Sequence, residues 1–447
     1  MKKSATAIAA LSALALASLT ACSSSGGGES KTITIAYESY GGTQMQDYMS
    51  RIAKQFDAKF PGCTAKLVPI QAAESDYYTK LALMNKSGKT APDVLYEDTF
   101  LIKSDAAAGY LAPLDDQVNK WSDWSQFPGN ARQAGQGADG KLYGIPMSTD
   151  TRALWYNSTV FHKAGIPVPW QPKNWNDILD AAKKIKAAEP DVIPFNIYSG
   201  KGTGEGSTMQ GFEMLLYGTA NQLTNNDGKW VAGSAGFRDS LQFIKDVYQG
   251  GLGPTAQQAL DPNWANQTPV LLSQDKLGIS LDGSWLSSSW TDAGVAPWSE
   301  WNGTMRQAKM PTQFGGAPGA TSMSGGWTLA MGSKSKNPTA AWNFISLALN
   351  KENSTYFAII SQGIPVRTDV ARDPHYIDSN PTNTFFADLV KISRFRPATA
   401  AYPEVSNNIQ VAMESVMTGQ STVAQAQKTF DSALPQAVGG SAQVVTK

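Results

Sequence analysis

Acidic, hydroxyl and aromatic side chains follow two of the strands that the sequence predicts. Glu38 and Tyr40 come directly after the first strand, and Asp98 and Thr99 come after a later, short apolar strand. Carboxylates accept hydrogen bonds from hydroxyl groups, and aromatic rings stack on flat apolar faces, so these residues could bind a polar ligand that also has C–H faces. The alternatives are a helix N-cap for Asp98 and Thr99 and a solvated turn for Glu38 and Tyr40.

Residue types and spacing argue against several kinds of catalysis. His162 and His375 are the two histidines, and they share neither an i,i+4 spacing nor a recognisable nucleophile motif. The glycine-rich stretch 202–206 lacks the strand-then-helix context of a phosphate-binding loop. The sequence therefore predicts a protein that is not an enzyme, with no metal and no cofactor.

Composition gives a second set of limits. The chain has 447 residues, enough for two to three domains, and its 37 Lys plus Arg balance 37 Asp plus Glu. Nucleic-acid binding needs clustered positive charge, so no nucleic-acid partner is expected. The 13 Trp and 15 Tyr are available for stacking on a ligand, although core packing will use most of them.

Strands and helices alternate from residue 31 onward, and these elements must position the side chains described above. The predicted strands are at 32–36, 64–70 and 93–96, and the predicted helices are at 44–60, 76–85 and 101–108. Such alternation is typical of parallel βαβ units in an α/β domain. Ligands of these sheets bind beyond the carboxyl ends of the strands, where the side chains described above lie.

The first thirty residues read as a targeting segment. Two lysines precede an apolar run (5–19) that is too short to span a bilayer comfortably. The tetrapeptide Leu-Thr-Ala-Cys at 19–22 resembles the lipobox of bacterial lipoproteins, in which the cysteine is lipidated. We therefore expect a signal peptide at 1–22, lipid on Cys22 and a flexible Gly/Ser tether at 23–30. Plain secretion is the alternative.

A series of short motifs runs through the rest of the chain in a fixed order. They lie at 139–146, 154–157, 161–166, 174–175, 282–285, 325–330, 337–349, 362–367 and 402–418. Together they resemble the extracellular solute-binding proteins of carbohydrate ABC transporters, the family of maltose-binding protein. The motifs cover nearly the whole chain after the tether, although no single one is specific.

The resemblance implies an α/β protein with the type II periplasmic-binding-protein-like fold, in which two lobes joined by a hinge enclose a ligand cleft. It places residues 31–148 plus 304–350 in the N-terminal lobe and 149–303 plus 351–447 in the C-terminal lobe.

The resemblance also implies a function. It predicts a lipid-anchored, monomeric protein on the outer face of the bacterial cell membrane that captures a di- to oligosaccharide, such as an α-glucoside. The protein would deliver this ligand to the permease subunits of an ABC transporter. The alternatives are a carbohydrate sensor or adhesin lipoprotein and, much less favoured, a glycoside hydrolase, which would need two carboxyl groups flanking the scissile bond.

Four candidate residues come from matches to the family near the hinge and the second lobe. Asp150 falls where the family often places an acidic hydroxyl acceptor, and Arg152 could contact the ligand or simply pair with Asp150. Asp282 and Trp285 end a predicted strand (277–281) and match a position where a tryptophan lines the cleft. A core tryptophan is the alternative for Trp285.

Gly325, Gly326 and Trp327 match a stretch where the family brings its backbone close to the ligand. Glycine allows such an approach because it has no Cβ, and a strand bend is the alternative. Trp264, in a predicted turn at 261–267, could stack on the ligand, with an aromatic ring packed on the surface as the alternative. Arg367 and Arg396 are the remaining candidates, and salt bridging is their alternative.

Overall fold

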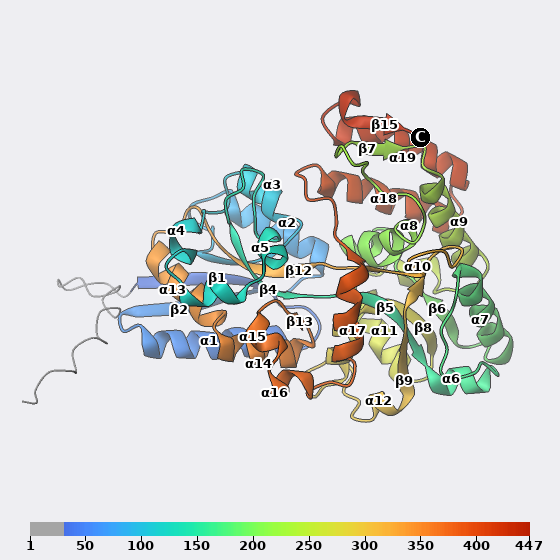
Figure 1. Cartoon of the computed structure of the whole chain (residues 1–447), viewed down its shortest axis with the longest axis horizontal. Helices are drawn as coiled ribbons and strands as arrows, with labels where there is room; N and C mark the ends of the chain where they lie inside the picture. Colours follow the sequence, from blue (N-terminus) through green and yellow to red (C-terminus); the bar gives the residue numbers. More distant parts are fainter. Residues whose placement is uncertain (1–30) are drawn as a thin grey trace, which may run out of the picture.

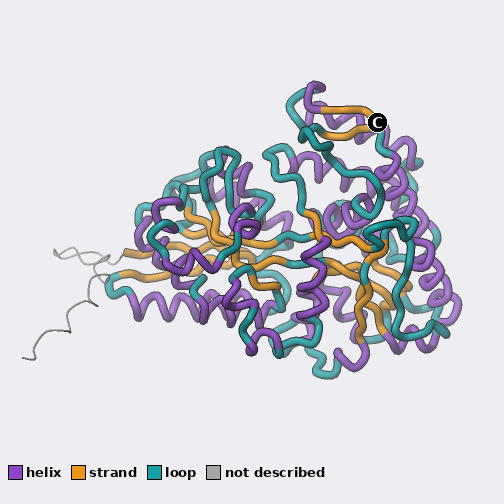
Figure 2. Tube along the Cα trace, in the orientation of Figure 1, coloured by secondary structure: helices purple, strands orange, loops and turns teal. Residues whose placement is uncertain are grey.

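A computed structural model describes residues 31–447, and the predicted signal peptide, Cys22 and the tether lie outside these described residues. Two lobes lie side by side, each with a β-sheet covered by helices (Figure 1). Figure 2 shows how the strands form the middle of both lobes while helices and loops lie outside them. Within residues 31–447, no helix combines the length and the apolar character needed to cross a membrane.

The first lobe contains a six-stranded sheet in the order β13-β4-β12-β3-β1-β2. Its strands are β1 (Lys31–Glu38), β2 (Cys63–Ile70), β3 (Val94–Asp98), β4 (Gly144–Thr149), β12 (Gly326–Met331) and β13 (Ile364–Pro365). β1 pairs in parallel with both β2 and β3, as the alternating pattern predicts. β12 is antiparallel to β3 and β4, so two segments far apart in sequence lie side by side at the centre of the sheet.

Helices cover this sheet because their apolar residues recur at helical spacing. In α1 (Gln44–Lys59), Tyr48, Ile52 and Phe56 lie one turn apart and are buried against the sheet. The other helices of this lobe are α2 (Glu74–Asn85), α3 (Ile102–Ala107), α4 (Asp115–Val118), α5 (Gly129–Gln133), α13 (Pro338–Ala348), α14 (Lys351–Ser361), α15 (Thr368–Ala371) and α16 (Pro374–Ile377).

The second lobe contains a four-stranded sheet in the order β6-β8-β5-β9, and smaller sheets extend it. Every residue of β5 and of β8 is buried, as expected for central strands covered on both faces. The strands of this lobe are β5 (Arg152–Asn157), β6 (Ile193–Asn196), β7 (Trp230–Ala232), β8 (Leu277–Gly283), β9 (Met305–Ala308), β10 (Met310–Pro311), β11 (Ala320–Met323), β14 (Ser393–Arg394) and β15 (Val444–Thr446).

Helices surround this second sheet, and several begin with a side-chain cap. Asn174 accepts the N–H of Asp177 at the start of α7, and Ser234 accepts the N–H of Phe237 at the start of α9. The helices are α6 (Ser158–Lys163), α7 (Trp175–Ala188), α8 (Met214–Leu216), α9 (Ala235–Gln249), α10 (Ala256–Ala259), α11 (Trp264–Ser273), α12 (Trp301–Thr304), α17 (Asn383–Leu389), α18 (Tyr402–Met417) and α19 (Val423–Ala437).

Two stretches of the chain, 305–323 with β9 to β11 and 351–377 with α14 to α16, lie on the other lobe from the one predicted for them. β9, predicted in the N-terminal lobe, pairs with β5 in the second lobe's sheet. β13, predicted in the C-terminal lobe, pairs with β4 in the first lobe's sheet. The crossings of the chain therefore lie near 149–152, between β11 and β12, and between α16 and α17. The predicted α/β two-lobed fold itself is confirmed. We call residues 31–447 the body. Each lobe of the body contains one large hydrophobic cluster.

Candidate functional site

A cavity of about 300 Å3 lies between the two lobes. Among the first-lobe residues that line it are Glu38, Tyr40, Glu74, Tyr96, Asp98 and Trp327. Among the second-lobe residues that line it are Arg152, Tyr198, Glu205, Met209, Trp285 and Arg396. The cavity thus presents rings and charged groups on both walls, at the low end of the size range of small-molecule sites.

The lobes touch one another around this cavity. Tyr40 donates its hydroxyl proton to the carbonyl oxygen of Pro262 at 2.7 Å. On another side, Phe100 of the first lobe packs edge-on against Tyr402 of α18, with ring centroids 5.8 Å apart. The structure is therefore a closed arrangement of the two lobes.

Aromatic rings form a wall in each lobe. In the first lobe, Trp327 on β12 stacks on Tyr96 on β3 with centroids 4.2 Å apart and an angle of 5° between the rings. Gly326, just before Trp327, has φ 140°, and a Cβ there would meet the carbonyl oxygen of Ser148 at 2.3 Å, so only glycine fits. In the second lobe, the Trp285 ring lies 4.7 Å below the guanidinium of Arg152.

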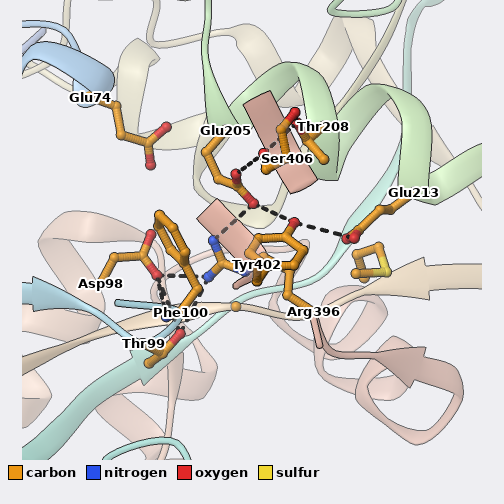
Figure 3. Close-up of polar contacts among 12 residues, drawn as sticks. Glu74, Asp98, Thr99, Phe100, Glu205, Thr208, Glu213, Arg396, Tyr402 and Ser406 are labelled. Carbon is orange, nitrogen blue, oxygen red and sulfur yellow. Dashed lines mark hydrogen bonds and ion pairs between the residues drawn. The ribbon is translucent and has the colours of Figure 1, made fainter. Parts of the chain in front are cut away.

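Arg396 joins the two walls of the cavity (Figure 3). Its Nη2 donates to Asp98 Oδ1 at 2.7 Å and to Thr99 Oγ1 at 3.3 Å, and its Nη1 donates to Glu205 Oε1 at 3.4 Å. The guanidinium also lies 4.5 Å over the ring of Phe100. Because Asp98 belongs to the first lobe and Glu205 to the second, this cation is shared across the cleft.

A buried polar network holds Glu205 in place. Glu205 Oε1 accepts from the Tyr402 hydroxyl at 2.7 Å, and Glu205 Oε2 accepts from Ser406 Oγ at 2.5 Å. The Tyr402 hydroxyl also lies 3.2 Å from Glu213 Oε1 (Figure 3). Glu213 ends a π-helical segment (Ser207–Glu213), a rare geometry that often occurs at functional sites. Burial raises the pKa of Glu205 above its usual value, while Arg396 opposes this rise.

Glu213 makes the stability of the body depend on pH. Burial, followed by the nearby Glu205, raises the pKa of Glu213 to about 8 from 4.5, and its Oε2 has no hydrogen-bond partner among the described residues. A carboxyl with a raised folded-state pKa stabilises the fold at low pH, and this contribution is lost as the pH rises toward 8. We expect Glu213→Gln to gain stability relative to the wild type between pH 5 and pH 8, measured by urea unfolding. Parallel pH profiles for the two proteins would contradict this.

Asp150 and Arg152 form an ion pair at the crossing between β4 and β5. Asp150 Oδ1 also accepts the backbone N–H of Gly325 at 2.7 Å, which ties the crossing to the segment that leads into β12. Both side chains also line the cavity. The predicted pairing of Arg152 with Asp150 is therefore present, and contact of Arg152 with a ligand stays a prediction.

The structure places most of the sequence-predicted residues at the cavity. Those that line it are Glu38, Tyr40, Asp98, Asp150, Arg152, Trp285, Gly326, Trp327 and Arg396. Asp98 does not cap a helix, because α3 begins after Leu101 without a side-chain cap; its Oδ1 accepts the N–H of Phe100 in a local turn and a bond from Arg396.

Three predicted residues lie behind this lining and contact it. Thr99 contacts Arg396, and Gly325 contacts Asp150. Asp282 is buried and accepts the Tyr198 hydroxyl at 2.7 Å, and burial raises the pKa of Asp282 to about 6. These residues support the lining and do not form it.

Two predicted residues lie away from the cavity. Trp264 begins α11 where the sequence suggests a turn; its ring is fully buried, and Nε1 donates to Asn196 Oδ1 at 2.9 Å. Arg367 is buried and pairs with Asp123 at 2.9 Å and Asp369 at 2.8 Å. Packing explains the first and salt bridging the second, so neither remains in the candidate ligand set.

The lining also contains residues that the sequence patterns did not indicate, among them Glu74, Tyr96, Tyr198 and Glu205. Tyr96 had a signal, since it lies on the predicted short strand two residues before Asp98. Glu205 lies in the glycine-rich stretch that fails as a phosphate-binding loop, and no pattern there marks an acidic cavity residue. No group of three or more His, Cys, Asp or Glu in the body is arranged to hold a metal ion.

Comparison with known proteins gives relatives along nearly the whole body. A binding protein of Brucella abortus is 26% identical over 416 residues, which cover 92% of this chain and 93% of the relative. The galactooligosaccharide-binding protein of Bacillus subtilis is 23% identical over 364 residues, 80% of each chain. An ABC transporter solute-binding protein of Thermotoga lettingae, solved with α-D-tagatose, superimposes with a TM-score of 0.80 at 24% identity, covering 92% of this chain and 100% of that chain.

The match to a protein family agrees with these relatives. Residues 42–355 match the family of bacterial extracellular solute-binding proteins. This range includes both sheets' central strands and most of the cavity lining. The two-lobed architecture, the cavity between the lobes and this match together establish that the chain belongs to the family of bacterial extracellular solute-binding proteins.

Proposed function

We propose that this protein binds a di- to oligosaccharide in the cavity between its lobes and delivers it to an ABC transporter permease. The observation that carries the proposal is the pair of aromatic walls, Trp327 on Tyr96 in one lobe and Trp285 in the other, with charged hydrogen-bonding groups between them. Rings stack on the C–H faces of a sugar, while carboxylates and guanidinium groups bond to its hydroxyls. The Bacillus subtilis relative, named for galactooligosaccharides, supports this ligand class.

Capture follows from the division of the lining between two lobes. An open protein offers a ligand one wall at a time, whereas the closed protein offers both, so the ligand binds the closed state more tightly and shifts the population toward it. The crossings of the chain beside β4 and β5 supply the hinge, and Asp150 and Arg152 lie there. No chemical step is required.

We further propose that the body is attached to the outer face of the cell membrane by lipid on Cys22, with residues 23–30 as the tether. The lipobox-like tetrapeptide and the family of extracellular proteins support this location. Intact mass of the protein extracted from membranes tests it. A mass without lipid, or with Cys22 in a disulfide, would contradict the anchor.

The proposed function is tested by thermal unfolding of the body against mono-, di- and oligosaccharides of several linkages. A ligand that binds only the folded state raises the Tm, because it increases the free energy of unfolding by about 2.7 kcal/mol when its concentration is 100 times its Kd. We expect a rise with one class of oligosaccharide and no cleavage of that sugar on long incubation. The absence of a shift with any carbohydrate would contradict the proposal, and cleavage would favour the hydrolase.

Permease delivery needs its own control. If the protein were a sensor or adhesin, the same sugar would bind, but cells that lack the protein would still take up the sugar at the normal rate. We expect uptake of the labelled sugar to fall in such cells and to return with the wild-type chain.

A further inference from the structure

The charges that line the cavity do not balance. Asp98 and Glu205 share Arg396, so these three groups together carry one excess negative charge. Asp150 and Arg152 neutralise each other near the hinge. Two more carboxyl groups of the lining, Glu38 and Glu74, form no salt bridge with any residue of the body, and each adds a negative charge when it is ionised.

Glu38 and Glu74 lie in the same corner of the cavity. Glu38, the last residue of β1, pairs with Ile70 at the end of β2, and the chain then begins α2 at Glu74, so both residues lie at the same end of the sheet. Burial, followed by Glu74 and Asp98, raises the pKa of Glu38. Glu74 accepts one hydrogen bond, from the Tyr78 hydroxyl at 2.6 Å. Figure 3 shows its carboxyl group directed toward the space beside Asp98 and Glu205, and the same Tyr78 hydroxyl lies 2.8 Å from Asp98 Oδ2.

The walls of this corner are aromatic. Tyr40 and Tyr96 both line the cavity. Burial raises the pKa of both hydroxyl groups, and the nearby Glu38 and Glu74 add to this rise. The faces of such rings attract cations, and a cation between two carboxylates in a partly dry cavity gains far more than a neutral hydroxyl does. The same corner repels anions.

We propose that the ligand of this cavity carries a basic nitrogen, as an amino sugar does, and that this nitrogen lies between Glu38 and Glu74. The inference rests on the proposed function, since it assigns a charge to the sugar that the two aromatic walls would bind. It goes beyond a neutral oligosaccharide and makes the two carboxylates the residues that determine specificity.

We expect the carboxyl group of Glu74 to be partly protonated at pH 7 in the free protein. Burial, followed by the neighbouring Asp98, raises the pKa of Glu74 to about 7, while Tyr78 and the more distant Arg396 oppose this rise and Glu205 adds to it. A bound cation reverses the effect, so part of the Glu74 population loses its proton when an amino sugar binds at pH 7. A neutral sugar gives no such release.

Calorimetric titration of the body at pH 7 tests the proposal with three matched sets of sugars. Each set contains a sugar with a free amine, its N-acetylated form and the parent sugar with a hydroxyl group in place of the amine. The three free amines are glucosamine, galactosamine and the β-1,4-linked glucosamine trisaccharide. We expect at least one free amine to bind tenfold or more tightly than both counterparts. Repeating that titration in two buffers of different ionisation enthalpy should reveal proton release.

The double variant Glu38→Gln, Glu74→Gln serves as the test of position, because it keeps both side chains' sizes and removes their charge. We expect it to lose the preference for the amine and the proton release while it still binds the hydroxyl parent. Arg51→Gln, at an exposed ion pair away from the cavity, should keep the preference.

The outcomes separate this inference from the proposed function. If a neutral sugar from these sets or from the thermal panel binds and no free amine binds more tightly than its counterparts, the inference fails and the proposed function stands. A preference that survives in the double variant also overturns the inference. If no carbohydrate binds in either experiment, the proposed function fails, and the inference fails with it.

Discussion

Replacing Trp285 by alanine should raise the Kd for the bound oligosaccharide about 30-fold, which corresponds to about 2 kcal/mol of lost stacking and apolar contact. The Trp285 ring lines the second-lobe wall, and Arg152 covers one face of it at 4.7 Å. The ring is half-buried and lies at the cavity edge of its lobe, so the Tm of the ligand-free body should change by a few degrees at most. Calorimetric titration with the sugar from the thermal panel measures the effect.

The matched control is Trp342→Ala. Trp342 is also half-buried, but it lies on α13 and packs on Trp121, away from the cavity lining. Its removal should leave the Kd unchanged. An unchanged Kd for Trp285→Ala would show that this ring does not stack on the ligand, and equal losses in both variants would point to a general loss of folding.

Replacing Arg396 by methionine should lower the free energy of unfolding by about 3 kcal/mol at pH 8, because removal of one partner of a buried ion pair leaves the other charges unpaired. Asp98 and Glu205 are 3% and 5% exposed and would both lose their cation. The loss should shrink at pH 5, since unpaired buried carboxylates have raised folded-state pKa values and become neutral by taking up protons. Urea unfolding at the two pH values measures this.

Arg51→Met is the control for this variant. Arg51 pairs with Glu352 at 2.6 Å, but the pair lies at the surface, where an ion pair contributes less than about 1 kcal/mol. Equal stability losses in the two variants, or a loss in Arg396→Met that does not depend on pH, would contradict the central place of Arg396 between the lobes.

Local patterns were sufficient to predict the strands that carry Glu38, Tyr96 and Asp98 in the first lobe, whereas the stretch with Trp327 came from the resemblance to the family. The alternation of β1, α1 and β2 follows from apolar spacing, and parallel pairing brings Glu38 and Asp98 to the same edge of the sheet. Apolar spacing shows which face of a strand or helix is buried, and Glu38 and Asp98 lie at the ends of the strands that this spacing identifies. The same reasoning could not place β9, whose partner β5 lies about 150 residues earlier in the chain.

Contacts across the cleft explain the rest of the difference. Arg396 bonds to Asp98 and Glu205, which are 298 and 191 residues away in sequence, so no local pattern could decide between a salt bridge and a ligand contact. Trp264 shows the converse, because the start of α11 turns its ring into the core where a turn would have exposed it. Glu205 lies in a glycine-rich turn directly before the π-helical segment (Ser207–Glu213). Neither the turn nor this segment has a regular apolar spacing that could be recognised in the sequence.

The central claim is that a sugar lies in the cavity between the two lobes. A crystal structure of the body with the oligosaccharide that gives the largest Tm shift tests this most directly. The account predicts sugar rings against Trp327 and Trp285, with hydroxyl or amine groups within hydrogen-bond distance of Asp98, Glu74 or Arg396. A sugar bound elsewhere on the body, with this cavity empty in the same crystal, would contradict it.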